Sequence, residues 1–365
     1  MIKRHHICLA PGALTAGGIR TAFLILAEAL LARGHCVDLL VTRQVMTEVA
    51  LPKGLRVIQA GTKTRNALPA ATRYLAQNTP DAVISARPYI DLLMMAARAL
   101  SGHQKCKLVW SFHTHQSSDY ATRGVGSRLL VRSAFVASRW ADSLVAVSDG
   151  VAEDIALAFL PAPRPVHTIY NPVKRADRSA AVSEPPHPWL KDKSIPVLLS
   201  IGRLVQQKDH MTLLQAFADL RKQRPVRLLI LGDGPMRSQL EAVAHSFGCA
   251  EEIDFLGHQV QPERFLSKAD GLVSTSLWEG FGYVLAEALA WCCPVIAADC
   301  PSGPAEVLGH GRYGRLVPPN DPNALCCAIA QALDDPKRTY TFKDDPLDRF
   351  DPDRIAQAYL DLLEG

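Results

Sequence analysis

Short runs of apolar residues alternate along the chain with longer segments in which apolar positions recur about every three or four residues. The short runs are typical of strands buried in a parallel sheet, and the longer segments are typical of helices that cover it. The predicted strands lie at residues 5–11, 36–41, 81–85, 107–112, 143–147, 196–202, 227–232, 252–257, 271–276 and 294–298. This alternation predicts an α/β fold with parallel sheets and helices on both faces.

The alternation is interrupted at residues 175–194, where three prolines stand among polar residues. Such a composition is typical of a linker. We therefore expect one domain at 1–174 and a second at 195–351, while a last helix at 352–365 could belong to either half or pack back onto the first. Ligands of open α/β sheets bind beyond the carboxyl ends of the strands, so two such domains predict a crevice where those ends face each other.

Length and composition agree with two domains, since 365 residues exceed what one hydrophobic core ordinarily holds. No apolar run reaches the roughly 18 residues of a membrane span, and the apolar part of the start is too short for a signal peptide. The nine cysteines include two adjacent pairs and no C-x-x-C motif, so we expect buried free thiols. These features predict a cytoplasmic protein.

The net charge of +4 conceals an asymmetry between the two halves. Residues 1–175 contain 21 Lys and Arg against 10 Asp and Glu, a balance of +11, and the remaining residues carry −7. A basic half of this kind suggests an anionic partner. Nucleic acid is not the expected partner, because aromatic residues do not interleave with the basic ones.

The most basic stretch, residues 120–141, contains four arginines and no acid. On one helix Arg128, Arg132 and Arg139 would fall near one face, beside leucine and aromatic residues, and Arg123 belongs to the same predicted membrane or acceptor surface. A basic amphipathic helix can lie on an anionic bilayer. The alternative is an ordinary amphipathic helix packed on its own sheet.

The first glycine-rich loop follows the strand at 5–11 and reads PGALTAGGIR. It lacks the Lys-Ser/Thr of a P-loop, and its spacing misses the G-x-G-x-x-G of dinucleotide-binding proteins. Gly17 and Gly18 would open the next helix and could offer backbone N–H groups to an anion. A tight turn without a ligand is the alternative.

In the second half three strands end in glycine, within the segments GRLVQQKD, GDGP and FLGH. Arg203 and Lys208 follow the first of these strands. An arginine fork and a lysine point charge at the mouth of a sheet could neutralise a diphosphate. Either residue alone would more often be a solvated surface charge.

The segment SLWEGFGYVLAEALA contains two glutamates, Glu279 in a loop before a helix and Glu287 inside an otherwise apolar helix at 283–291. Gly280 and Gly282 let the backbone approach a ligand and expose N–H groups at the positive end of the helix. A carboxylate in an apolar helix is costly unless a partner lies close. Sugar hydroxyls would be suitable partners, and the alternatives are an ion pair or a carboxylate that interacts with the helix dipole.

These motifs, taken in order, resemble retaining glycosyltransferase family 4, whose members have the GT-B fold of two Rossmann-like domains facing across a cleft. The resemblance extends over nearly the whole chain, through GG near the start, FHTH, AVSDGV, YNPV, GRLVQQKD, GDGP, FLGH, the paired glutamates and DCPSGPAEVL. The last of these is similar to enzymes that build bacterial surface polysaccharides and lipid-linked oligosaccharides from UDP-hexoses or UDP-hexosamines.

The resemblance implies a role for each matched residue. Glu287 would accept the ribose hydroxyls, Glu279 would lie near the donor sugar, and Arg203 with Lys208 would bind the diphosphate. Backbone N–H groups of Phe281, Gly282 and Tyr283 would bind sugar hydroxyls or phosphate, and Gly257, His258 and Val260 would flank the base. His113 would reach the donor sugar, although His115 is close enough in sequence to be confused with it. Many relatives have a glycine pair where this chain has Ser302, Gly303 and Pro304 ahead of Glu306.

The predicted reaction is transfer of a hexose or N-acetylhexosamine from a UDP-sugar to a glycan acceptor, expected to be lipid-linked, by front-face attack that retains the anomeric configuration. Neither a metal nor another cofactor is expected, because the D-x-D at Asp351 and Asp353 reads as a helix N-cap. The predicted location is peripheral, on the cytoplasmic face of the inner membrane. Alternatives are a soluble small-molecule glycosyltransferase, a GT-B sugar-nucleotide epimerase and a non-catalytic nucleotide-sugar-binding subunit.

Overall fold

The computed structural model describes residues 3–15, 17–43, 50–177, 185–192, 194–335 and 344–364. Its contacts divide the chain into two compact units. The first unit combines Met1–Val173 with Arg349–Gly365, and the second is Lys174–Asp348. The boundary falls beside the expected one at residue 174, and the terminal helix belongs to the first unit. Part of the predicted linker, residues 178–184 and 193, lies outside the described residues.

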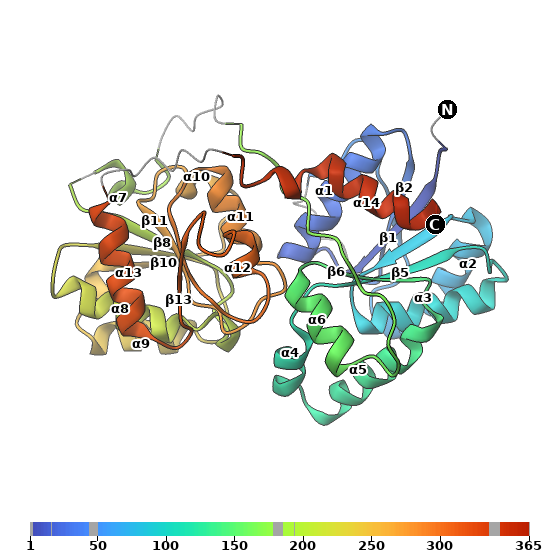
Figure 1. Cartoon of the computed structure of the whole chain (residues 1–365), viewed down its shortest axis with the longest axis horizontal. Helices are drawn as coiled ribbons and strands as arrows, with labels where there is room; N and C mark the ends of the chain where they lie inside the picture. Colours follow the sequence, from blue (N-terminus) through green and yellow to red (C-terminus); the bar gives the residue numbers. More distant parts are fainter. Residues whose placement is uncertain are drawn as a thin grey trace. The chain divides into compact units, whose positions relative to one another are not determined.

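The first unit contains one parallel seven-stranded sheet with strand order β3-β2-β1-β4-β5-β6-β7. Its strands are β1 (His6–Gly12), β2 (Cys36–Val41), β3 (Arg56–Gln59), β4 (Ala82–Ser85), β5 (Lys107–Phe112), β6 (Ser143–Ala146) and β7 (His167–Thr168). Its helices are α1 (Gly18–Ala32), α2 (Leu68–Asn78), α3 (Pro88–Ser101), α4 (Gln116–Thr122), α5 (Val125–Ala137), α6 (Asp149–Ala158) and α14 (Pro352–Glu364). Helices α2, α3, α5 and α6 share one buried cluster with the sheet, and α14 lies along α1 (Figure 1).

The second unit contains a parallel six-stranded sheet with order β10-β9-β8-β11-β12-β13. Its strands are β8 (Val197–Ile201), β9 (Arg227–Leu231), β10 (Ile253–Gly257), β11 (Gly271–Ser274), β12 (Val295–Ala298) and β13 (Arg315–Val317). Its helices are α7 (Pro188–Lys191), α8 (His210–Arg221), α9 (Arg237–Ser246), α10 (Glu263–Leu266), α11 (Tyr283–Ala290), α12 (Pro304–Val307) and α13 (Pro322–Asp334). Helices α8, α9 and α13 bury their apolar faces in one cluster, while α11 contacts both α10 and α12.

The structure confirms the predicted α/β fold with two parallel Rossmann-like sheets, and all ten predicted strands are present. Three further strands, β3, β7 and β13, were not predicted. Each lies at an edge of its sheet and is at most four residues long. Edge strands pack against a neighbour on one side only, so they lack the apolar run that marks an interior strand.

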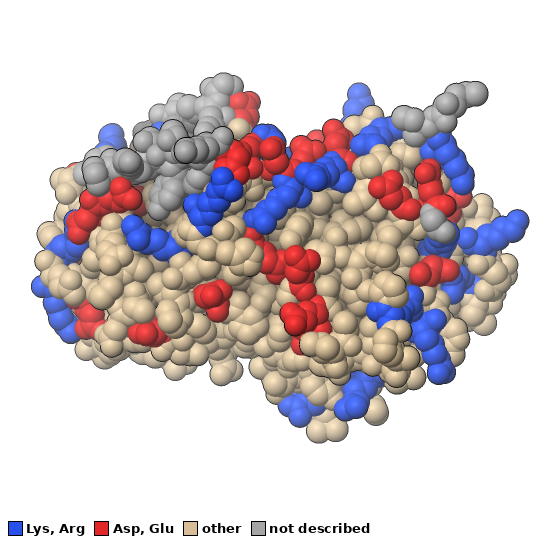
Figure 2. All heavy atoms as spheres, viewed as in Figure 1, with Lys and Arg blue, Asp and Glu red and all other residues tan. Residues whose placement is uncertain are grey.

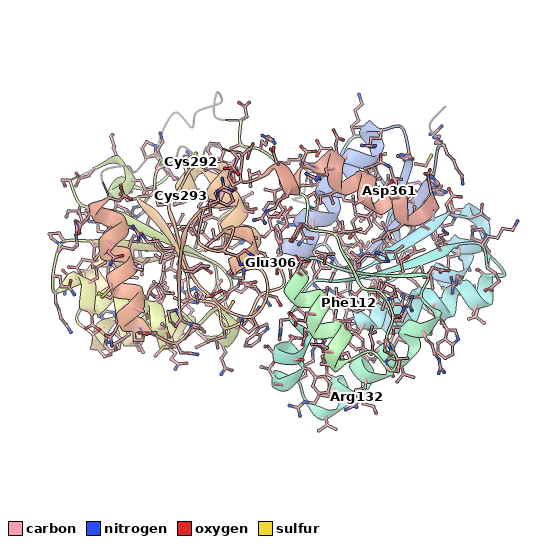
Figure 3. All side chains as sticks on the ribbon, viewed as in Figure 1. Phe112, Arg132, Cys292, Cys293, Glu306 and Asp361 are labelled. Atoms are coloured by element: carbon pink, nitrogen blue, oxygen red, sulfur yellow. The ribbon has the colours of Figure 1, made fainter. Side chains whose placement is uncertain are left out.

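Cysteine burial agrees in part with the expectation of buried thiols. All nine cysteines are free, and six of them are buried. In each adjacent pair one member is buried and the other is not: Cys293 is buried beside the half-buried Cys292 (Figure 3), and Cys326 is buried beside the exposed Cys327. Within the described residues, no helix is both long and apolar enough to cross a membrane.

Candidate active site

The carboxyl ends of β8 and β11, which pair side by side in the second unit, carry two loops that hold each other. We call residues 202–209 the lysine loop and residues 275–282 the glutamate loop. Leu277 N donates to Gln207 O at 2.8 Å, Gln207 Nε2 donates to Trp278 O at 2.9 Å, and Thr275 Oγ1 donates to Lys208 O at 2.9 Å. The two loops therefore form one connected structure at this edge of the sheet.

This structure brings Lys208 and Glu279 together. Lys208 Nζ forms an ion pair with Glu279 Oε1, and both side chains are mostly buried. The same carboxylate oxygen accepts a hydrogen bond from Ser276 Oγ at 2.7 Å. Sequence reasoning missed Ser276, although a hydroxyl three residues before a loop carboxylate was a signal that could have found it.

A third loop, after β12, packs against the glutamate loop. Glu279 N donates to Pro301 O at 3.3 Å. Gly303 has φ +91°, and a Cβ atom at this position would lie 2.6 Å from the carbonyl carbon and oxygen of Phe281. Only glycine permits this approach, so Gly303 fixes the position of the glutamate loop. Glu306 lies on the short helix α12 that follows this loop (Figure 3).

Helix α11 positions Glu287 among buried apolar neighbours, Ala286 and Ala288. The Glu287 side chain is partly exposed, and its carboxylate has no hydrogen bond or ion pair with any described residue. Burial, with a smaller contribution from the charge of Glu263, raises the pKa of Glu287 to about 7. The protein thus holds a carboxylate whose hydrogen-bonding partners it does not itself supply.

Other predicted donor-binding residues lie in the same unit but not against this pair. Arg203 is exposed at the start of the lysine loop and makes no ion pair with a described residue. Gly257 ends β10, and His258 and Val260 after it are exposed. A cavity of about 590 Å³ lies there, lined by Pro185, Pro186, His258, Gln259, Val260, Gln261, Arg264 and Phe265. Its volume is in the range of small-molecule sites.

The first glycine of the GDGP segment, Gly232, has a packing role. A Cβ atom at Gly232 would lie 1.9 Å from the carbonyl oxygen of Gly202, and Gly232 N donates to Gly257 O at 2.8 Å. The ends of β8, β9 and β10 therefore meet too closely for any side chain at this position.

In the first unit the structure separates the two candidate histidines. His113 Nε2 lies 3.0 Å from Ser111 Oγ, and its Nδ1 has no hydrogen-bond partner among the described residues. Burial, followed by the charge of Arg87, lowers the pKa of His113 to about 3, so its ring is neutral near pH 7. His115 instead caps α4 through Nδ1, which accepts from Ser118, and its Nε2 lies 3.7 Å from Asp154. Of these two histidines, His113 is the one with a buried ring nitrogen that lacks a hydrogen-bond partner among the described residues.

Gly17 and Gly18 begin α1, as expected from the sequence. Gly17 is the N-cap residue, with no side-chain cap, and the first turn of the helix contains no acidic residue. A helix N-terminus leaves backbone N–H groups without intrahelical partners, and anion binding at Gly17 and Gly18 stays a prediction.

The prediction of one continuous basic helix at 120–141 is wrong. Helix α4 ends at Thr122, α5 begins at Val125, and Arg139 lies in a separate 3₁₀ turn, Ser138–Trp140. Arg123 forms an ion pair with Asp119, and Arg128 donates to the carbonyl oxygens of Tyr120 and Ala121. Arg128 stabilises the end of α4, because it binds carbonyl groups that a helix terminus leaves unpaired, and Arg123 adds an i,i+4 ion pair across the last turn.

The outer face of α5 keeps an exposed surface of apolar and basic residues. Val125, Leu129 and Val136 are 84%, 71% and 50% exposed. Arg132 lies among them on the outside of the helix (Figure 3), and Figure 2 shows Lys and Arg side chains over this end of the unit. The opposite face packs inward, where Phe135 stacks on Phe112 of β5 at 5.4 Å between ring centroids.

Each of the two units matches a known family of glycosyltransferases. Residues 184–344 match the family Glycosyl transferases group 1, and residues 16–177 match Glycosyltransferase Family 4. The chain is 31% identical over 62% of its length to the N-acetylgalactosamine-N,N'-diacetylbacillosaminyl-diphospho-undecaprenol 4-alpha-N-acetylgalactosaminyltransferase of Campylobacter jejuni, of which the match spans 60%. It is 27% identical over 69% of its length to the lipopolysaccharide 1,6-galactosyltransferase of Escherichia coli, of which the match spans 65%.

Among solved structures, the sucrose-phosphate synthase of Thermosynechococcus elongatus is similar to the whole chain. The two share a TM-score of 0.82 at 21% identity, over 99% of this chain and 98% of that one. At this identity the similarity concerns the fold alone.

Proposed function

Since the chain belongs to glycosyltransferase family 4 and has the GT-B fold, we propose that it transfers a hexose or an N-acetylhexosamine from a UDP-sugar to a glycan acceptor, with retention of the anomeric configuration. The observation that carries this proposal is the Lys208–Glu279 pair at the carboxyl edge of the second sheet. A cation and an acid in one connected loop structure can bind the two parts of an activated sugar, its diphosphate and its hydroxyl groups.

The donor is bound by the second unit in this proposal. Lys208 and Arg203 contact the diphosphate, together with backbone N–H groups at the start of α11, where the helix dipole favours negative charge. Glu287 accepts hydrogen bonds from the ribose hydroxyls, because its carboxylate has no partner within the described protein. Glu279 accepts hydrogen bonds from the sugar. Gly257, His258 and Val260 lie beside the base.

In the transfer step, the bond between the anomeric carbon and the diphosphate oxygen breaks, and the acceptor oxygen forms a new bond on the same face. The acceptor proton passes to the departing phosphate oxygen. Negative charge grows on the diphosphate during this step, so fixed cations and amide dipoles lower the barrier. His113, neutral near pH 7, serves as a hydrogen-bonding group for the donor sugar, not as a cation.

The acceptor in this proposal is a lipid-linked glycan of bacterial surface polysaccharide, lipopolysaccharide or glycoprotein-glycan assembly. The names of the two relatives support it, since one acts on a diphospho-undecaprenol-linked sugar and the other on lipopolysaccharide. We place the protein at the cytoplasmic face of the inner membrane, attached by the outer face of α5. Exposed apolar residues beside Arg132 suit the headgroup region of an anionic bilayer.

A thermal-shift screen of UDP-sugars tests the donor proposal, because a true donor stabilises the fold by about 2.7 kcal/mol at a concentration 100 times its dissociation constant. Glu287→Ala should abolish the shift. Glu251→Gln, which changes an exposed carboxylate of the same unit, should leave it unchanged. Failure of every UDP-sugar to raise the melting temperature of the wild-type protein would refute the proposed donor.

Flotation with anionic liposomes tests the membrane proposal separately. Leu129→Gln should reduce the floated fraction. Leu157→Gln should leave it unchanged, because Leu157 is at least as exposed, at 79%, but lies on α6 in the same unit. Equal flotation of the two variants would argue against α5 as the attachment surface.

A further inference from the structure

The first sheet carries a row of cations at its carboxyl edge. Strands β3, β2, β1 and β4 are neighbours in that order. Arg43 follows β2, Arg20 lies in the first turn of the helix after β1, and Arg87 follows β4. Lys63 and Arg65 follow β3. We call these five residues the basic edge.

Among the described residues, the basic edge has no partners of opposite charge. None of the five forms an ion pair or donates a side-chain hydrogen bond to a described residue. Several arginines elsewhere in the unit do have such partners: Arg56 is paired with Asp38, Arg98 with Asp142, and Arg164 donates to two backbone carbonyls. The five cations of the basic edge follow the carboxyl ends of the strands, where ligands of such sheets bind.

Acidic residues are almost missing from the same positions. Among the described residues between the ends of these four strands and the first turns that follow, the only acid is Asp91. Asp91 is fully buried, its Oδ1 accepts from Ser85 Oγ at 2.5 Å, and burial raises its pKa to about 8. It is therefore mostly protonated near pH 7 and does not neutralise the edge.

Arg87 is the most constrained member of the basic edge. It is the N-cap residue of α3, and its Nε is shielded from solvent without an acceptor among the described residues. Its charge also acts on His113 at the end of the neighbouring strand β5. A buried guanidinium N–H without an acceptor lowers the stability of the folded protein, and a ligand that supplies the acceptor removes this penalty.

We propose that the basic edge binds phosphate carried by the acceptor, with Arg87 as its central contact. This inference rests on the proposed function and adds the chemical class of the acceptor to it. Neighbouring strands lie about 4.8 Å apart, so residues from β1, β2 and β4 can contact adjacent phosphate groups together. Arginine forks bind phosphate oxygens through two parallel hydrogen bonds, which favours phosphate over an uncharged sugar.

Titration of the full-length protein with inorganic pyrophosphate tests this site. A saturating concentration of UDP is kept present so that the proposed diphosphate site of the second unit is filled. Arg87→Gln should weaken pyrophosphate binding about tenfold or more, the loss of one charge-assisted hydrogen bond. Arg73→Gln is the matched control. Arg73 is an exposed arginine of α2 that does not belong to the basic edge, and its replacement removes the same charge. The melting temperature and UDP affinity of both variants report their folding.

The outcomes separate this inference from the proposed function. Equal pyrophosphate affinities of the Arg87→Gln and Arg73→Gln proteins, or no binding to wild type, would overturn the inference while UDP binding kept the donor proposal intact. A different result would overturn the donor proposal alone. In that result the wild-type protein does not bind UDP, while pyrophosphate binding is lost in Arg87→Gln and kept in Arg73→Gln. Two competitors of bound pyrophosphate identify the source of the phosphate. Stronger competition by a short-chain prenyl diphosphate indicates a lipid carrier, and stronger competition by a hexose 6-phosphate indicates a phosphorylated glycan.

Discussion

Replacement of Glu287 by glutamine should stabilise the protein while it removes donor binding. The carboxylate lies in an apolar helix without a partner among the described residues, and its pKa is raised from 4.5 to about 7. Between these two pH values the folded protein keeps a proton that the unfolded chain releases. Stability therefore falls as pH rises through this window, the sign expected for a carboxyl group whose folded pKa is raised.

The size of the effect follows from the two pKa values. The proton-linked destabilisation by Glu287 is about 1 kcal/mol near pH 5 and about 3 kcal/mol near pH 8, where the folded protein must hold the charged form. Glutamine cannot ionise, so the stability gain from Glu287→Gln should grow by roughly 2.5 kcal/mol across this range. Loss of the negative charge of Glu263 should reduce the gain, because that charge contributes to the raised pKa.

Urea unfolding of wild type and variant at several pH values between about 5 and 8 measures this difference. The comparison isolates Glu287, because Asp91 and His113 also titrate differently in the folded protein but contribute equally to both curves. Glu251→Gln, which removes one exposed carboxylate of the same unit, is the control for the loss of one negative charge. A pH-independent difference for Glu287→Gln would refute the argument from burial, and undiminished UDP binding would refute the role of the carboxylate.

Further predictions concern the loops and the two histidines. Gly303→Ala should lower stability by about 1–3 kcal/mol and weaken UDP binding, as seen in denaturant melts and titration calorimetry, because the new methyl group overlaps the backbone of the glutamate loop. His115→Ala should cost about 1 kcal/mol of stability through loss of the α4 cap, with turnover nearly unchanged. His113→Ala should lower turnover with UDP affinity intact; the reverse pattern for the two histidines would contradict their assignment. Lys208→Met should weaken UDP binding more than the double variant Lys208→Met/Glu279→Gln does, because the single change leaves a carboxylate unpaired near the diphosphate.

The interior of each sheet was predictable because burial on both faces leaves a continuous apolar run in the sequence. The strands β1 and β8 are examples, since almost every residue in them is buried. The edge strand β3 was not predictable for the opposite reason, because its four residues are all exposed or half-buried. The break at Gly124 was missed because α4 and α5 both have helical periodicity, and only the capping of carbonyls by Arg128 shows where the first helix ends.

The sequence was sufficient to predict most of the residues of the candidate site, but not which of them contact each other. Glu279 and Lys208 were each expected at the mouth of the sheet, yet no spacing rule joins two residues that lie 71 positions apart. Their pairing depends on the adjacency of β8 and β11, which only the strand order reveals. The basic edge of the first unit was hidden for the same reason, because its arginines are dispersed along the sequence and become neighbours only through the sheet.

The two acids of the donor site differ in what a ligand must displace. Glu279 already accepts from Lys208 and Ser276, so a diphosphate that takes Lys208 exchanges one charged partner for another, and the net gain of such an exchange is small. Glu287 has no partner to exchange among the described residues, so hydrogen bonds from a ribose relieve a cost that the folded protein already bears. Affinity should therefore come mainly from the nucleoside end of the donor, while the Lys208–Glu279 pair contributes where charge develops, at the diphosphate during transfer.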